Sequence, residues 1–257
     1  MEYIRLGKTG LIVSRSAFDT GALVRAVQDG ACEADAAAEL LYAAYEGGIN
    51  FFYVPFCADA CTRMIGALTS FRTDIYIACA SDAKNGADLK KDAEYMLSCM
   101  QTDYIDLYCV RDQGVVPQPD GRDGLCAALD ELHGAGKIAH TGFITENFTH
   151  MRQAAFSPFW QAVQFPFHFL LREKHLHSAD ICLQNDTGFI AAEPLAGGRI
   201  EHISLAFGFL RTKENTLTLW RIRTKDELEQ ILYFEKNPPA TDELFFADIE
   251  KEKKRLL

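Results

Sequence analysis

The chemistry-bearing residues of this sequence gather in the stretch INFFYVPFCADAC, residues 49–61. A run of apolar and aromatic residues, typical of a buried strand, meets a proline, and Cys57 and Cys61 follow on an expected loop. Tyr53 offers a phenol that could donate a proton, whereas the two thiols could bind a metal or undergo redox chemistry. Each role needs partners from elsewhere in the chain.

The two cysteines alone do not make a metal site. Zinc and iron–sulfur sites need three or four ligands at matched spacing. A C-x₃-C-x₂-C pattern would need a cysteine at position 64, where the sequence has Met64. We therefore expect no metal here and interpret Cys57 and Cys61 as incidental loop thiols.

Three further polar residues follow strand-like runs. Arg111 could bind an anion, or it could pair with Glu193 or with a nearby aspartate, Asp59 or Asp112. Glu193 could be a general base, or the partner of Arg111. His168 could be a catalyst, but a lone histidine there is more often an ordinary loop residue.

The elements that must position these residues alternate regularly. Strand-like runs are expected at 11–18, 50–54, 74–80, 104–110, 137–143, 162–167, 187–193 and 215–220. Helical patterns lie between them, for example at 31–48, 87–101 and 124–136. Short continuous apolar strands are typical of a parallel sheet that is buried on both faces. Eight such units in 257 residues predict an α/β protein with a (β/α)₈ TIM-barrel fold.

No linker or low-complexity tract divides the chain, so we expect one domain over residues 1–257. The tail predicts an outer helix near 241–257. In a barrel of this class the functional side chains lie at the carboxyl ends of the strands. Four strand-end residues should therefore share one mouth: Tyr53, Ala80, Arg111 and Gln164.

Composition narrows the class of partner. The net charge is −10 and the pI about 5.2, which argues against nucleic acid, because phosphate binding needs a basic surface. No apolar stretch is long enough to span a membrane, and the N-terminus lacks a signal-peptide pattern, so we expect a cytoplasmic protein. The eight scattered cysteines are expected to be reduced and mostly buried.

Several stretches resemble bacterial aldo-keto reductases: MEYIRLGKTGLIVSRSAFDTGAL, AAELLYAAYEGGINFF, QTDYIDLYCV, GKIAHTGF, VQFPFHFLLRE and PLAGG. The resemblance runs from the first residue to about 200 and continues more weakly through 203–236. It implies a TIM barrel that reduces carbonyl compounds with NADPH. It also implies four catalytic side chains at strand ends, namely an Asp, a proton-donating Tyr, a Lys and a His.

This sequence departs from the family at all four positions. The Asp position holds Tyr53, the Tyr position Ala58, the Lys position Ala80 and the His position Arg111. A shift of one residue would place Cys57 instead of Ala58 at the Tyr position. Alanine has no proton to give, and general acid catalysis contributes roughly 10²–10⁴-fold. We therefore expect Arg111, Tyr53 and Phe56 to fill the former substrate space.

The cofactor positions that the resemblance implies also differ. The residues are Ile144 and Thr145 at the amide clamp, Ala192 at the stacking ring and Ile231 at the adenine contact. The loop after PLAGG, which covers the dinucleotide in the family, is shortened. Only Gln164 keeps its family identity, while Arg221 and Arg223 could still meet a phosphate. We expect no cofactor, the alternative being weakly bound NADP.

Four functions remain compatible with the sequence. The first, which we favour here, is a pseudoenzyme with a binding or regulatory role towards an unknown small molecule or protein. The others are a barrel repurposed for another reaction, a NAD(P)H-dependent oxidoreductase with catalytic groups at unfamiliar positions, and an unselected remnant. An open polar pocket would favour the second, and a filled one the first. The candidate pocket comprises Tyr53, Cys57, Arg111, Gln164, His168 and Glu193.

Overall fold

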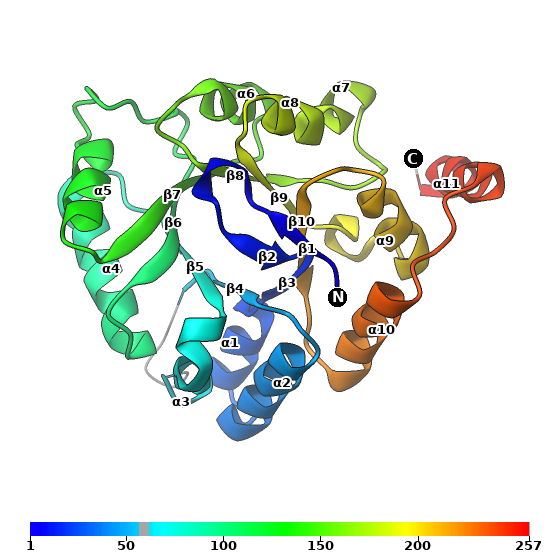
Figure 1. The fold of residues 1–257 in the computed structure, drawn as a ribbon, viewed down its shortest axis with the longest axis horizontal. Coiled ribbons are helices and arrows are strands. Elements are labelled where there is room, and N and C mark those ends of the chain that lie inside the picture. The colour runs from blue at the N-terminus through cyan, green and yellow to red at the C-terminus, as the bar shows by residue number, and fades with distance from the viewer. Residues whose placement is uncertain (57–61, 257) are drawn as a thin grey trace.

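Eight parallel strands close into a barrel in the computed structural model, which describes residues 1–56 and 62–256 (Figure 1). Around the barrel the strands follow the order β10-β3-β4-β5-β6-β7-β8-β9. Their bounds are β3 Ser16–Asp19, β4 Phe51–Val54, β5 Tyr76–Ser81, β6 Ile105–Arg111, β7 Ile138–Ile144, β8 Ala162–Pro166, β9 Gly188–Ala192 and β10 Thr216–Arg221. The predicted (β/α)₈ class is confirmed, because each strand pairs in parallel with both neighbours.

Helices surround the barrel (Figure 1). Their bounds are α1 Gly21–Gln28, α2 Ala34–Glu46, α3 Thr62–Gly66, α4 Gly86–Met100, α5 Leu125–Gly134, α6 Phe148–Phe156, α7 Glu173–Leu176, α8 Ser178–Gln184, α9 Ile203–Arg211, α10 Lys225–Lys236 and α11 Glu243–Leu256. Asn85, Asn147 and Thr224 begin α4, α6 and α10, where each side chain accepts hydrogen bonds from first-turn backbone amides. The last helix, α11, lies outside the barrel (Figure 1).

The first expected strand, 11–18, is two strands in the structure. β2, Ile12–Ser14, pairs antiparallel with β1, Tyr3–Arg5, and β3 then enters the barrel. This hairpin covers the amino-terminal end of the barrel, where Leu6 and Val13 are fully buried in the inner core. The sequence did not indicate the boundary between β2 and β3, because both strands contain apolar residues and together they look like one run. Helix α1 was also missing from the prediction.

Small side chains predominate along part of the inner core. Ala17, Ala78 and Ala80 point into the barrel with Cys109. Gly142 on β7 faces the same space, and a methyl group there would lie 2.5 Å from the Cys109 sulfur. Apart from Phe51 and Tyr53, which belong to the inner core, the buried large aromatic side chains, such as Trp160, pack between the strands and the helices.

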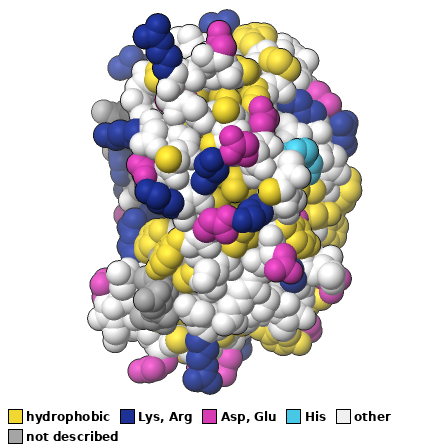
Figure 2. All heavy atoms as spheres, turned by 90° about the vertical axis from the view of Figure 1, so that its left-hand side faces the viewer, with side chains coloured by type: hydrophobic (Ala, Val, Ile, Leu, Met, Phe, Trp, Pro, Cys, Tyr) yellow, Lys and Arg dark blue, Asp and Glu magenta, His cyan; other side chains and the backbone are white. Residues whose placement is uncertain are grey.

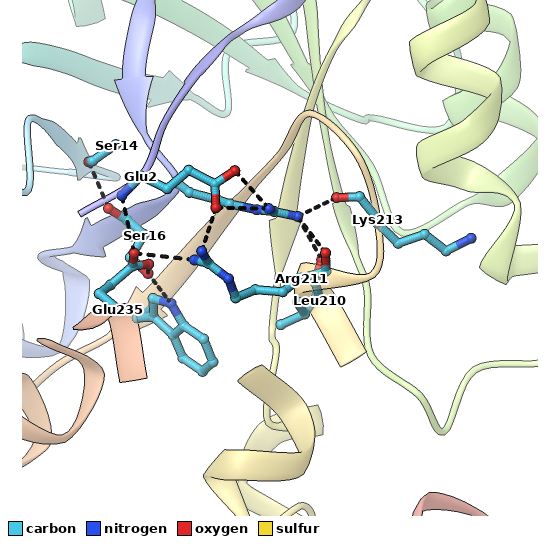
Figure 3. Close-up of polar contacts among 9 residues, drawn as sticks. Glu2, Ser14, Ser16, Leu210, Arg211, Lys213 and Glu235 are labelled. Atoms are coloured by element: carbon cyan, nitrogen blue, oxygen red, sulfur yellow. Dashed lines mark hydrogen bonds and ion pairs between the residues drawn. The ribbon is translucent and has the colours of Figure 1, made fainter. Parts of the chain in front are cut away.

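Charged side chains join the elements at the amino-terminal end, and Figure 3 shows their contacts. The Glu235 carboxylate, whose side chain is 2 % exposed, accepts hydrogen bonds from Ser16 Oγ at 2.5 Å and Arg211 Nη1 at 3.2 Å. Arg211 also pairs with Glu2, as does Arg15. We infer that this network fixes the hairpin and α10 to the barrel, because each buried charge has an opposite partner.

The outer face over α4 and α5 carries charges of both signs, interspersed (Figure 2). Lys90 pairs with Glu131 at 2.7 Å, and Lys137 pairs with Glu94. That face therefore presents no patch of a single sign. No helix of the described ranges is both long and apolar enough to cross a membrane.

Most of the described cysteines behave as expected. Cys79, Cys109, Cys126 and Cys182 are buried free thiols, and Cys32 is a half-buried one. Cys99 is instead disulfide-bonded, so the expectation of a reduced thiol is wrong for that residue. Cys57 and Cys61 lie outside the described residues.

Candidate functional site

A cavity of about 720 Å³ opens at the carboxyl ends of the barrel strands. Its lining comes from β3, β4, β6, β7, β8, β9 and β10, from loops that follow barrel strands, including the loop after β5, and from α1, α9 and α10. Tyr53, Phe56 and Arg111 line this space but do not fill it, so the prediction of a filled site is wrong. The volume is that of an ordinary small-molecule site.

Tyr53 and Arg111 form the polar floor of the cavity. Arg111, the last residue of β6, donates a hydrogen bond from Nη2 to the Tyr53 hydroxyl oxygen at 2.7 Å. Its Nε lies 3.4 Å from Asp82 Oδ1, whose side chain is 76 % exposed. Burial raises the pKa of Tyr53, and the nearby guanidinium partly opposes that rise. The phenol is therefore neutral at physiological pH.

Arg111 was predicted to pair with Glu193 or with a loop aspartate, and the second alternative forms, because Arg111 pairs with Asp82 on the loop after β5. The pair with Glu193 does not form. Glu193 pairs with Arg221, whose Nη2 lies 2.6 Å from the carboxylate. Asp112 is likewise engaged elsewhere, because its carboxylate contacts His150 Nδ1 at 2.7 Å. The order of the strands explains why Glu193 pairs with Arg221: β9 and β10 are neighbours in the barrel, whereas β7 and β8 separate β6 from β9. Asp59 lies outside the described residues.

Asp19 and Asp82 are site residues that the sequence reasoning missed. Asp19 ends β3, is 9 % exposed and accepts a hydrogen bond from the Gly21 amide at 2.8 Å. Burial raises the pKa of this carboxyl group, although Arg221, 3.6 Å away, opposes the change. The available signal was position, because both aspartates come at the carboxyl end of a barrel strand.

Gln164 lines the cavity from β8 with a side chain that is largely buried. Its carboxamide has no hydrogen-bond partner within the described part of the chain, so it is available to a ligand. Ala80 belongs to the inner core and does not line the cavity. Ala58 and Cys57 fall outside the described residues.

His168 does not line the cavity with the other candidates. Its Nδ1 is buried without a hydrogen-bond partner among residues 1–56 and 62–256. Burial lowers the pKa of His168 to about 4. The imidazole of His168 is neutral and lies outside the cavity, so it is not placed for catalysis on a ligand bound there. The structure therefore separates His168 from the candidate pocket.

The cavity continues from Tyr53 towards α10. Arg221, Arg223, Gln230 and Ile231 line this second end. Arg223 pairs with Glu227 at 2.8 Å, one turn apart on an exposed surface. Ile144, Thr145 and Ala192 line the part between the two ends. No group of three metal-binding side chains occurs in the described ranges, and the metal prediction for Cys57 and Cys61 stays a prediction.

A closed (β/α)₈ barrel with a polar cavity at its carboxyl end is the architecture of many enzymes. Residues 64–233 match the model of the aldo/keto reductase family. The chain therefore belongs to the aldo/keto reductase family, as its resemblance predicted.

Solved structures agree in fold. An aldo-keto reductase from Pseudomonas aeruginosa is 18% identical with a TM-score of 0.76, covering 90% of this chain and 91% of its own. A second structure from that organism, also 18% identical, has a TM-score of 0.79, with coverage of 92% and 94%. The holo form of an aldo-keto reductase from Bacillus halodurans is 18% identical with a TM-score of 0.76, covering 100% and 96%. No curated protein sequence matches this chain significantly.

The expectation of no cofactor is overturned. Membership of the aldo/keto reductase family places this chain among proteins whose ordinary cofactor is NAD(P)H. Replacement of individual cofactor-contacting residues was too weak a basis for expecting that the cofactor is lost. Altered side chains leave a barrel mouth open unless other groups fill it, and here the cavity remains.

Proposed function

We propose that this chain is a NAD(P)H-dependent oxidoreductase that reduces a small carbonyl compound, with Tyr53 as the proton donor. The observation that carries this proposal is the 2.7 Å hydrogen bond from Arg111 to Tyr53 at the floor of the cavity. The family supplies the reaction class, and the Tyr53–Arg111 pair supplies a phenol and a cation in place of the family's usual residues.

The lining residues fit a nicotinamide cofactor at both ends of its expected path. Gln164 offers an unpartnered carboxamide to the nicotinamide amide, and Arg221 and Arg223 offer charge to the phosphates. Both arginines are now paired with carboxylates, and both pairs are partly exposed. Such pairs are worth roughly 0–1 kcal/mol each, so a phosphate could displace them. The bound cofactor would supply the hydride that reduces the carbonyl carbon.

The chain's own residues would handle the proton. The Tyr53 oxygen accepts a hydrogen bond from Arg111, which leaves the phenolic O–H free to donate to a substrate carbonyl oxygen in the cavity. As the proton leaves, negative charge grows on the Tyr53 oxygen. The adjacent guanidinium stabilises that charge at the moment when it develops. A positioned general acid contributes roughly 10²–10⁴-fold to the rate.

A second candidate function is a NAD(P)H-responsive binding protein without turnover. One observation favours it: across the described ranges, no lysine or histidine lines the cavity. The lysine and histidine that accompany the proton donor in the family therefore have no counterparts in the cavity lining. The Tyr53 pKa is also raised rather than lowered, which weakens the phenol as an acid. This function corresponds to the pseudoenzyme hypothesis, now with a ligand.

Purified protein separates the two candidates. NADPH and NADH are titrated by fluorescence, and turnover is then measured with a panel of aldehydes and ketones. Reduction that falls at least about 100-fold in Tyr53→Phe, with cofactor affinity unchanged, supports the oxidoreductase. Tyr42→Phe, an exposed tyrosine on α2, is the matched control and should keep full activity. Cofactor binding without any turnover favours the second function, and absence of binding refutes both.

A further inference from the structure

Arg111, at the cavity floor, has hydrogen-bond donors that no described residue uses. A guanidinium group carries five N–H donors. Nη2 uses one on Tyr53, and Nε faces Asp82 at 3.4 Å. Among the described residues no other acceptor contacts this side chain, so three donors remain. Because Tyr53 and Arg111 both line the cavity, the unused edge of the fork is accessible from the same space as the phenol.

Asp82 does not neutralise this cation strongly. Its side chain is 76 % exposed, whereas that of Arg111 is 32 % exposed. An ion pair with so exposed a partner contributes roughly 0–1 kcal/mol, because water screens the attraction. The other carboxylates that line the cavity are Asp19, Glu146, Glu193, Glu201 and Glu227. None of the ion pairs among the described residues joins one of these five to Arg111: Asp19 and Glu193 pair with Arg221, and Glu227 pairs with Arg223. A ligand anion therefore meets a guanidinium that is only weakly satisfied.

The spacing of the two polar groups selects a type of ligand. Arg111 Nη2 and Tyr53 Oη are 2.7 Å apart. In a planar 2-oxo acid, the carboxylate carbon is bonded directly to the carbonyl carbon, so the two oxygens on the same side of that bond are about one hydrogen-bond length apart. One oxygen can then accept from the guanidinium while the other accepts from the phenol. Arginine is also the side chain best suited to planar recognition of a carboxylate.

We propose that the carbonyl substrates of this site are 2-oxo acids, with Arg111 binding the carboxylate and Tyr53 donating to the 2-oxo oxygen. This inference rests on the proposed function for the reaction. With NAD(P)H bound, Tyr53 would give its proton to the 2-oxo oxygen and regain one from solvent, and the cofactor would supply the hydride to the carbonyl carbon. The products would be a 2-hydroxy acid and NAD(P)⁺. Carboxylate recognition by Arg111 is a separate property that binding alone can measure.

The first experiment uses oxamate, a 2-oxo acid analogue that cannot be reduced in this way, and its neutral ethyl ester. Calorimetric titrations with and without NADP⁺ compare the wild type with Arg111→Met, Arg111→Lys and the exposed control Arg152→Met on α6. We expect oxamate to bind at least about 10-fold tighter than its ester to the wild type and the control. Arg111→Met should lose this preference, and Arg111→Lys should recover part of it. Equal affinity for acid and ester, equal oxamate affinity in Arg111→Met, or no oxamate binding in either condition overturns the inference.

The second experiment compares turnover of phenylglyoxylate and its methyl ester with NADPH and NADH. A kcat/KM at least about 10-fold higher for the acid, lost in Arg111→Met, supports the inference. Reduction of the ester in preference to the acid overturns it and leaves the proposed reductase intact. Selective oxamate binding without reduction of either compound counts against the reductase and supports the carboxylate site.

Discussion

Arg221 on β10 holds the Glu193 carboxylate at 2.6 Å, just past the end of β9, where the Glu193 backbone has a φ of 50°. A non-glycine residue in this left-handed region stores strain and persists only when its surroundings hold it. Arg221 also approaches Asp19 on β3 at 3.6 Å, so one guanidinium joins three consecutive strand ends. A phosphate that binds Arg221 must compete with two carboxylates.

Replacing Glu193 should therefore strengthen cofactor binding. In Glu193→Gln the competing charge is gone, and the gain is that of one partly exposed ion pair, roughly 0.2–1 kcal/mol. We expect the Kd for NADPH to fall by up to about fivefold, with a steeper dependence on salt. Fluorescence titration at two ionic strengths measures both. Glu229→Gln, an exposed change on α10, is the control. Weaker NADPH binding in Glu193→Gln would show that this carboxylate orients Arg221 for the cofactor.

The network at the amino-terminal end should be important for stability. Glu235→Ala leaves Arg211 and the Ser16 hydroxyl without their shared acceptor. Loss of one partner of a buried charge pair costs about 3–5 kcal/mol, and here Arg211 keeps Glu2, which reduces the cost to about 2–3 kcal/mol. Urea unfolding measures the change. Glu229→Ala on the exposed side of the same helix should change stability by less than about 0.5 kcal/mol. Equal effects of the two variants would contradict a structural role for this network.

The pH dependence of stability should include a contribution from His168. Burial lowers the pKa of this side chain to about 4 from its ordinary value of 6.5. Between these pH values the unfolded chain binds more protons than the folded chain, so the free energy of unfolding rises as pH increases from about 4 to about 6.5. The rise should be on the order of 1–2 kcal/mol, because the ring is only partly buried. It should disappear in His168→Gln and persist in His177→Gln, an exposed histidine.

The inner core should be sensitive to one methyl group on β7. In Gly142→Ala the new methyl would lie 2.5 Å from Cys109 Sγ, so the strands must shift. We expect a loss of about 1–3 kcal/mol. Removing the sulfur in the double variant Gly142→Ala/Cys109→Ala should recover part of that loss. Thermal unfolding of the two single variants and the double variant gives the coupling. Strictly additive effects would mean that the clash is relieved elsewhere.

The positions of the strands could be predicted because continuous apolar runs leave few alternatives. The run 137–143 differs from β7 by one residue at each end, and the run 162–167 differs from β8 by one residue at its end. The hairpin could not be predicted, since β1 and β2 pair with each other rather than with the barrel. That pairing depends on a surface which only the closed barrel provides.

For the candidate site, strand-end positions could be predicted and side-chain partners could not. Tyr53, Arg111 and Gln164 do line one cavity. Arg111 contacts Tyr53 and Asp82 rather than Glu193. A long side chain can reach several partners, and the distances that decide between them cannot be read from the sequence. The open cavity could not be predicted for the same reason, because its volume depends on how the loops and side chains pack in three dimensions.

The hairpin at the amino-terminal end also has a consequence for synthesis of the chain on the ribosome. Leu6 and Val13 emerge long before Leu217 and Leu219, although all four belong to the same inner core. The backbone amide of Glu2 contacts Glu235, which is 233 positions later in the sequence. Until β10 and α10 emerge, the hairpin has no complete native surface to cover, so its apolar side chains stay unprotected while most of the barrel is synthesised.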